Sequence, residues 1–61
     1  MFLKFTETKS NKVIVINLKH IVAVFEATEG EFEGKTIINL VNGAVSVDES
    51  LVTVMGQLAA V

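Results

Sequence analysis

The sequence predicts an α+β domain that is mostly β: a small antiparallel β-meander of about five strands with one C-terminal helix packed on one face. Two observations carry this prediction. Runs of β-branched residues alternate with turn signals over residues 1–47, and after Val47 the hydrophobic period changes from two to about 3.6. At 61 residues the chain is a single small domain, residues 1–61, because it is too short for a catalytic domain beside a cofactor domain.

The first half of the chain predicts three strands. Residues 1–7 alternate as a short strand, the polar segment 8–12 is a turn, and residues 13–16 are a β-branched run typical of a second strand. Residues 17–20 interrupt this pattern and residues 21–26 resume it. Because both alternating sides of these middle strands are apolar, we expect each side to be covered by packing.

The next segments predict a second hairpin. Residues 27–34 are acidic and contain two glycines, which favours a long loop, and residues 36–41 form the following strand. Asn42 and Gly43 predict a type I′ turn, because that turn needs positive φ at both central positions. Residues 44–47 then close the hairpin.

A helix is predicted after residue 47. Four apolar residues at the spacing i, i+3, i+4 and i+7 define its buried face: Leu51, Val54, Met55 and Leu58. Two starts fit: Asp48 as N-cap with Glu49 in the first turn, or Ser46 as N-cap with Glu49 closing a capping box. Gly56 and the β-branched residues 52–54 lower helix propensity, so the helix depends on packing against the sheet.

Strand alternation divides the apolar residues into two faces. The core face collects the helix stripe and these strand residues: Leu3, Phe5, Ile14, Ile16, Ile21, Ala23, Phe25, Ile38, Leu40, Val45 and Val47. The opposite face collects another apolar set: Val13, Val15, Val22, Val24, Ile37 and Val41. A nearly continuous apolar surface rarely faces water in a monomer. The second set is therefore the predicted oligomer interface.

Size and composition also favour association. The chain is 51% hydrophobic and has no cysteine. In a domain this small, the stabilisation from apolar burial only roughly offsets the entropy of ordering the chain. Disulfides are excluded, and one histidine with scattered acids gives poor material for a metal site. Homo-oligomerisation remains as the expected source of additional stability.

Several classes of function are disfavoured. The net charge of −2 and the scattered lysines argue against duplex DNA as a ligand. The chain has no cysteine nucleophile, phosphate-binding loop or dinucleotide fingerprint, so we expect neither an enzyme nor a cofactor. The longest apolar run, residues 21–25, is far shorter than the ~20 residues of a membrane helix. With no targeting segment, the expected location is cytoplasmic.

Two residues are candidates for contact with a ligand or partner. His20 is the only histidine and begins an apolar strand, where it is either a surface or turn-capping residue or an acid, base or ligand. Phe32 lies in the acidic loop, where it either tucks back onto the sheet as a lid or contacts a ligand or partner. Both interpretations stay open for each residue.

Three segments resemble one family. Residues 15–21 (Val-Ile-Asn-Leu-Lys-His-Ile) resemble its Asn-x-x-x-Ile step into a second hairpin. Residues 36–43 (Thr-Ile-Ile-Asn-Leu-Val-Asn-Gly) resemble its Thr-x-Ile-x-Leu-x-Asn-Gly hairpin. Residues 47–50 (Val-Asp-Glu-Ser) are similar to its Val-x-Glu-Ser helix entry. The family is the small flagellar FlbD-like, or SwrD-like, proteins, and the resemblance implies a small non-enzymatic accessory protein.

The sequence thus predicts a non-catalytic homo-oligomeric module that acts by contact with itself or another protein. The alternative is an oligomeric regulator of phage or bacterial origin that binds a small molecule or RNA at subunit junctions. For RNA, a ring of subunits would repeat Lys9, Lys12 and Lys19, and stacking would come from Phe2 or Phe32.

Overall fold

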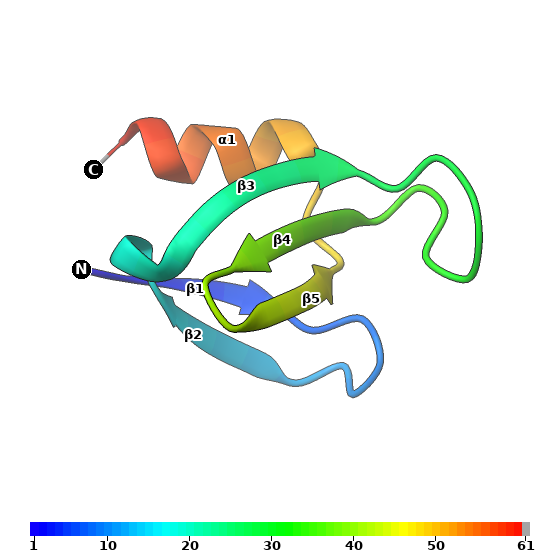
Figure 1. The fold of residues 1–61 in the computed structure, drawn as a ribbon, viewed down its shortest axis with the longest axis horizontal. Coiled ribbons are helices and arrows are strands. Elements are labelled where there is room, and N and C mark those ends of the chain that lie inside the picture. Colours follow the sequence, from blue (N-terminus) through cyan, green and yellow to red (C-terminus); the bar gives the residue numbers. More distant parts are fainter. Residues whose placement is uncertain (61) are drawn as a thin grey trace.

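The computed structural model describes residues 1–60. It confirms the predicted fold class, with five strands followed by one C-terminal helix (Figure 1). The elements are β1 (Phe2–Thr6), β2 (Val13–Asn17), a short 3₁₀ helix η1 (Leu18–His20), β3 (Ile21–Glu26), β4 (Thr36–Leu40), β5 (Gly43–Val47) and α1 (Leu51–Ala59).

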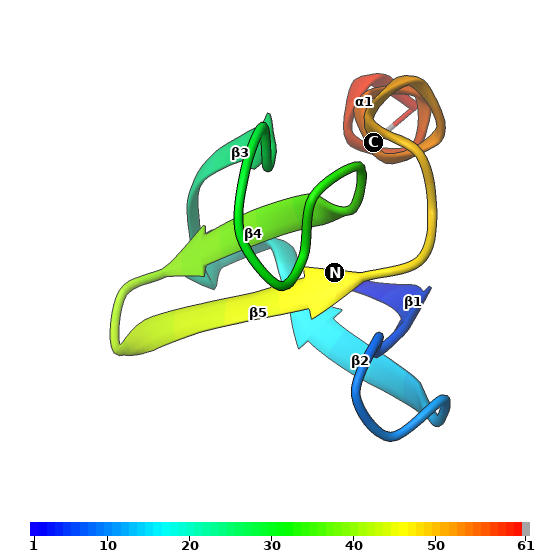
Figure 2. The same cartoon turned by 90° about the vertical axis from the view of Figure 1, so that its right-hand side faces the viewer.

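The strands form two antiparallel sheets, β1-β2 and β3-β4-β5. The sheets meet where the end of β1 lies beside the end of β5 (Figure 2). Here the Thr8 N–H donates to Ser46 O at 2.9 Å, and the Asp48 N–H donates to Thr6 O at 2.8 Å. The strands therefore follow one another in the order β2-β1-β5-β4-β3, which leaves β2 and β3 as the outer strands.

The core lies between the sheets and α1, which runs alongside β3 (Figure 1). Its buried hydrophobic residues are Leu3, Phe5, Ile16, Ile38, Val47 and Val54. Half-buried residues pack around them: Ile14, Leu18, Ile21, Val24, Leu40, Val45 and Leu58. On the predicted helix stripe, Val54 and Leu58 do face the core, but Met55 is exposed.

The faces of β3 differ from the prediction. Pairing with β4 shifts between Ile21 and Ala23, which leaves Val22 as an extra residue in β3. Beyond such a bulge, each side chain points to the side opposite to that expected from simple alternation. Val24 consequently packs against the core, while Ala23 and Phe25 are exposed. The prediction of Ala23 and Phe25 as core residues, and of Val24 as an outer residue, is wrong.

The β4–β5 hairpin also turns differently. Leu40 pairs with Gly43, so the loop residues are Val41 and Asn42. Asn42 does not have positive φ, and the predicted type I′ turn is wrong. In the observed register the buried Thr36 lies near the segment before α1, where its hydroxyl donates to a backbone carbonyl oxygen at 2.7 Å. This long-range contact favours the observed register over the local turn preference.

Helix α1 begins later than either predicted start. Ser50 is the N-cap, and its hydroxyl oxygen accepts a hydrogen bond from the Thr53 N–H at 3.2 Å. Ser46 is buried in β5, which continues to residue 47, so its side chain is not available to cap a helix. Asp48 instead lies 3.4 Å from the Lys35 ammonium. Both predicted N-caps are therefore wrong.

Candidate functional site

The six residues of the predicted interface do not form one continuous face. Val13 and Val15 lie on the outer side of the β1–β2 hairpin, with 67% and 56% of their surface exposed. Val22 lies at the β3 bulge and Val41 lies in the β4–β5 turn, and both are exposed. Ile37 is half-buried on β4. Together with the core position of Val24, this arrangement separates the predicted set into distinct surfaces.

The first surface is the hairpin patch, which we define as Phe2, Val13 and Val15. Phe2 was not in the predicted interface, but it is exposed and lies on the same side of the hairpin as the two valines. Lys4 pairs with Val15 across the strands, and so lies within the patch. Neighbouring side chains on one face of an antiparallel pair are close enough to be covered together by one partner.

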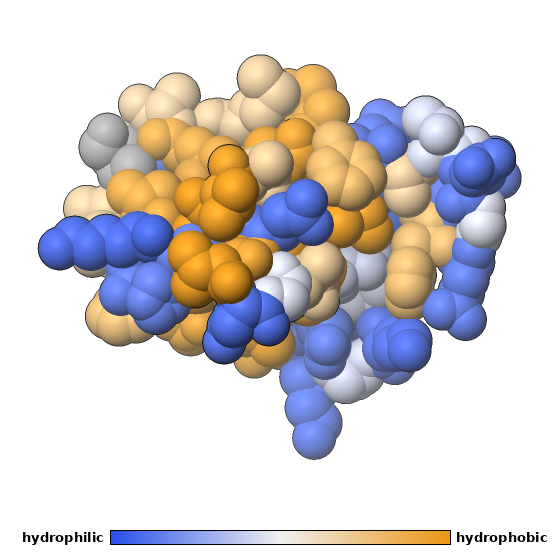
Figure 3. Space-filling view, viewed as in Figure 1, coloured by the Kyte–Doolittle hydropathy of each residue, from blue (hydrophilic) through white to orange (hydrophobic). Residues whose placement is uncertain are grey.

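The second surface is the sheet patch, which we define as Ala23, Phe25 and Ile37. Phe25 and Ile37 are directly paired, and both lie on the side of the sheet away from α1. Hydrophobic atoms gather over β3 on this face, while hydrophilic atoms gather over the β3–β4 loop (Figure 3). The bulge creates this surface because it turns Phe25 outward. Residues 21–26 contain no local signal of the bulge, such as a glycine within the strand.

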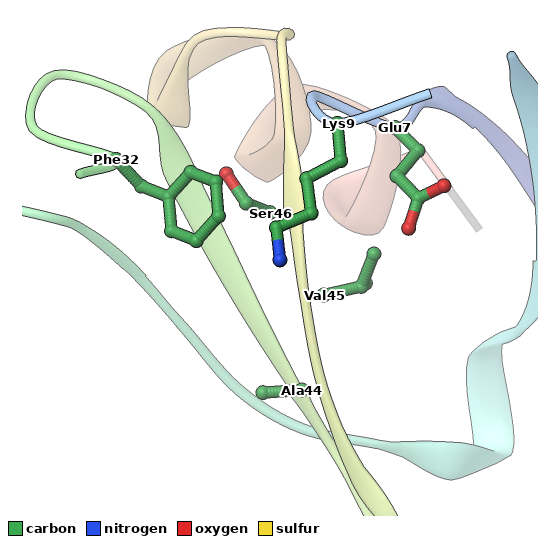
Figure 4. Close-up of a pocket in the computed structure, with 6 residues that line it drawn as sticks. All are labelled: Glu7, Lys9, Phe32, Ala44, Val45 and Ser46. Carbon is green, nitrogen blue, oxygen red and sulfur yellow. The ribbon is translucent and has the colours of Figure 1, made fainter. Parts of the chain in front are cut away.

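A cavity of about 240 Å³ lies beside β5 (Figure 4). Its lining residues are Glu7, Lys9, Phe32, Ala44, Val45 and Ser46. Phe32 comes from the β3–β4 loop, and Glu7 and Lys9 come from the β1–β2 turn. The Lys9 ammonium is 5.8 Å from the centroid of the Phe32 ring, within range of a cation–π interaction. Two turns that are distant in sequence therefore meet over one strand.

Local hydrogen bonds shape the turn that forms one wall of this cavity. The Ser10 hydroxyl donates to the Glu7 carboxylate at 2.6 Å, and the Thr8 and Ser46 hydroxyls are 3.0 Å apart. Asn11 has a φ of +58°, a left-handed conformation that asparagine tolerates well. These contacts connect the turn to β5, which keeps Lys9 near the Phe32 ring.

The groups that line the cavity are suited to binding a small ligand. The cavity presents an ammonium, a carboxylate and an aromatic face, which together can hold a small polar or planar group. Phe32 is half-buried and contributes to the cavity wall, and its contact with a ligand or partner stays a prediction. Lys9 was predicted only as part of a lysine stripe for RNA, and Glu7 was not predicted as a site residue. Their proximity to Phe32 arises only when the two hairpins meet.

His20 lies apart from this cavity. It is exposed at the end of η1, and its backbone carbonyl oxygen accepts a hydrogen bond from the Val41 N–H at 3.0 Å. Among residues 1–60, no group of three or more His, Cys, Asp and Glu side chains is arranged to hold a metal ion. His20 thus contacts the predicted interface residue Val41 through its backbone.

In the described range, residues 1–60, no helix combines the length and the apolar character needed to cross a membrane. No protein-family model, curated protein sequence or solved structure matches the chain. The assignment of the candidate surfaces therefore rests on the geometry of the structure alone.

Proposed function

We propose that this protein is a non-catalytic interaction module that forms homo-oligomers and acts as an accessory or regulatory protein by protein contact. The observation that carries the proposal is the exposure of large hydrophobic side chains on the strands and in the β4–β5 turn: Phe2, Val13, Val15, Val22, Phe25 and Val41. Burial of a valine or phenylalanine side chain contributes about 1.5–3 kcal/mol. Covering even the hairpin patch would therefore stabilise an assembly substantially.

The small size of the core supports the same proposal. The buried hydrophobic residues of the described chain are few, and several strand residues around them remain only half-buried. A domain of 61 residues without disulfides is marginally stable by itself. Association would cover further apolar surface and so raise the free energy of unfolding.

The resemblance to the FlbD-like family also favours a small accessory protein over an enzyme. Residues 36–43 and 47–50, which carry much of that resemblance, correspond to the β4–β5 hairpin and to the segment that leads into α1. The proposal keeps the cytoplasm as the expected compartment. A role in motility would follow only if the partner proteins prove to be flagellar.

The double substitution Val13→Thr and Val15→Thr tests the proposal. Threonine keeps the shape and strand propensity of valine, but its buried hydroxyl costs about 1–3 kcal/mol when it lacks a partner. We expect wild-type protein to sediment as an oligomer at micromolar concentration, and the double variant to need at least about tenfold higher concentration to assemble. Val52→Thr, on the exposed side of α1, is the matched control. A folded wild-type monomer at these concentrations would contradict the proposal.

A second candidate function is nucleotide or single-stranded RNA binding, and the cavity is the observation that favours it. Phe32 supplies an aromatic face for a base, and Lys9 supplies a cation for a phosphate. We expect uridine monophosphate to shift the NMR signals of the cavity residues. Phe32→Ala should weaken that binding at least about fivefold, since stacking on an aromatic contributes about 1–3 kcal/mol. Lys4→Ala is the control, because Lys4 neither lines the cavity nor belongs to the lysines predicted to bind RNA. Unchanged spectra at millimolar nucleotide would exclude this function.

A further inference from the structure

The outer edge of β2 has backbone groups that point away from the protein. β2 pairs with β1 alone among the described strands. The Glu7 N–H donates to Lys12 O and the Leu18 N–H donates to Met1 O, both at 2.9 Å. Hydrogen-bonded and non-bonded pairs alternate along an antiparallel ladder. Ile14 and Ile16 therefore bond to β1, while Val13 and Val15 direct their N–H and C=O groups outward.

The hydrogen bonds that β1 makes on its side away from β2 agree with this alternation. Thr6 pairs with Val13 across the hairpin, yet the Thr6 backbone bonds away from β2: its N–H donates to the Glu49 carboxylate and its C=O accepts from the Asp48 N–H. Asn17 lies two residues after Val15, so its backbone N–H points to the same side of β2. Its φ and ψ, −73° and 123°, are those of an extended strand. The Asn17 N–H is therefore the third outward donor on β2.

This edge lacks the features that usually prevent edge-to-edge association. Proteins protect outer strands with prolines, bulges, inward charges or a covering helix. At the opposite end of the strand order, β3 has a bulge at Val22 and α1 alongside it. β2 is the unbroken sequence Val-Ile-Val-Ile-Asn, in which the only polar side chain is the terminal amide. Of the two outer strands, β2 is the better template for pairing.

We propose that β2 pairs antiparallel with β2 of a second copy, about a two-fold axis at Val15. This inference rests on the proposed function, because it names the strand through which copies associate. In this register Val15 faces its own equivalent, and Val13 faces Asn17 of the other copy. The pairing uses the outward groups of Val13 and Val15 and the N–H of Asn17. A register centred on Ile14 would leave the Asn17 N–H unpaired.

The side chains suit this register on both faces. On the inner face, Ile14 lies opposite Ile16 of the other copy, so the half-buried Ile14 gains an apolar neighbour. On the outer face, the hairpin patches of the two copies join into one apolar strip. A two-fold interface of this kind is closed, since the same surface is used on both copies.

The charges are also compatible with self-association. Lys12 lies opposite Leu18 of the other copy, so like charges do not face each other there. Lys4 lies on β1, one strand away from the new junction. The two Lys4 positions are thus separated by three strand spacings, about 14 Å. Salt at physiological ionic strength largely screens repulsion between exposed charges at that distance.

A pair of proline substitutions tests the edge directly. Val15→Pro removes one outward N–H and adds a ring at the proposed junction, while the bonds of Ile14 and Ile16 to β1 remain. Glu26→Pro is the matched control on the other outer strand: the Ala27 N–H bonds to Lys35 O, so the Glu26 N–H points away from β4. We expect Val15→Pro to raise the dissociation constant measured by sedimentation equilibrium at least tenfold. Glu26→Pro should retain the wild-type value.

Amide hydrogen exchange of the wild-type protein gives a second readout that does not depend on how well a variant folds. We expect the amides of Val13, Val15 and Asn17 to be protected at high protein concentration and to lose protection on dilution, while the Glu26 amide stays unprotected. If wild-type protein assembles but Val15 exchanges as fast as Glu26, the edge pairing is wrong and copies meet elsewhere, such as at the sheet patch. If wild-type protein is monomeric, the proposed function itself is wrong.

Discussion

Phe5→Ala is expected to unfold most of the protein at 25 °C. Phe5 is 1% exposed and packs within the core beside β4, β5 and α1 residues such as Ile38, Val47 and Val54. Truncating a buried phenylalanine to alanine lowers the free energy of unfolding by about 3–5 kcal/mol, through lost burial and the cavity left behind. Small domains have total stabilities near the lower end of the usual range of about 5–15 kcal/mol. Circular dichroism during urea titration measures the loss.

Phe25→Ala is the matched control for this variant. Phe25 is 45% exposed on the outer side of β3, so its truncation should cost no more than about 1 kcal/mol at concentrations where copies do not associate. The comparison also tests the bulge at Val22, because simple alternation would put Phe25 in the core. Equal destabilisation by the two substitutions would show that β3 keeps the uninterrupted pattern.

Glu49→Ala is expected to lower the free energy of unfolding by about 2–3 kcal/mol. Both carboxylate oxygens of Glu49 accept from the Thr6 N–H, at 2.9 and 3.1 Å, and the Thr6 hydroxyl donates to one of them at 3.1 Å. Removing the carboxylate leaves a part-buried backbone N–H without its partner, and hydrogen bonds to charged groups are among the stronger ones. Urea titration of the wild-type and variant proteins measures the difference.

Asp48→Ala is the control for Glu49→Ala. Asp48 is the neighbouring acid, and its side chain makes an ion pair with Lys35 at 3.4 Å near the surface. Exposed pairs of this kind contribute about 0–1 kcal/mol. If the two substitutions destabilise the protein equally, the contact between Glu49 and Thr6 does not hold β1 to the segment before α1.

The approximate positions of the strands and of α1 could be predicted from the sequence, because hydrophobic period and turn composition are local. The β-branched runs at residues 13–16 and 21–26 and the helical spacing from Leu51 to Leu58 correspond closely to β2, β3 and α1. The faces of β3 could not be predicted, since the bulge depends on how β3 pairs with β4. A shift of one residue inverts every side chain that follows.

The candidate site was predictable only in part. Exposure of Val13 and Val15 follows from alternation in an unbulged strand, and the structure agrees. The meeting of Lys9 with Phe32 depends on two turns separated by 23 positions, for which a single sequence carries no signal. Ser50 becomes the N-cap of α1 directly after Glu49, whose carboxylate bonds to Thr6 of β1, again a long-range contact.

The junction of β1 with β5 has a consequence for how the chain folds. Thr6 bonds to Glu49 across 43 positions of sequence, and Thr8 bonds to Ser46 across 38. The β1–β2 and β3–β4–β5 hairpins, by contrast, join neighbouring strands and can form early, since short loops close fastest. We therefore expect a transition state in which both hairpins exist before they dock. During synthesis, β1 can make these contacts only after residues 46–49 have left the ribosome. Its apolar side chains stay exposed until then.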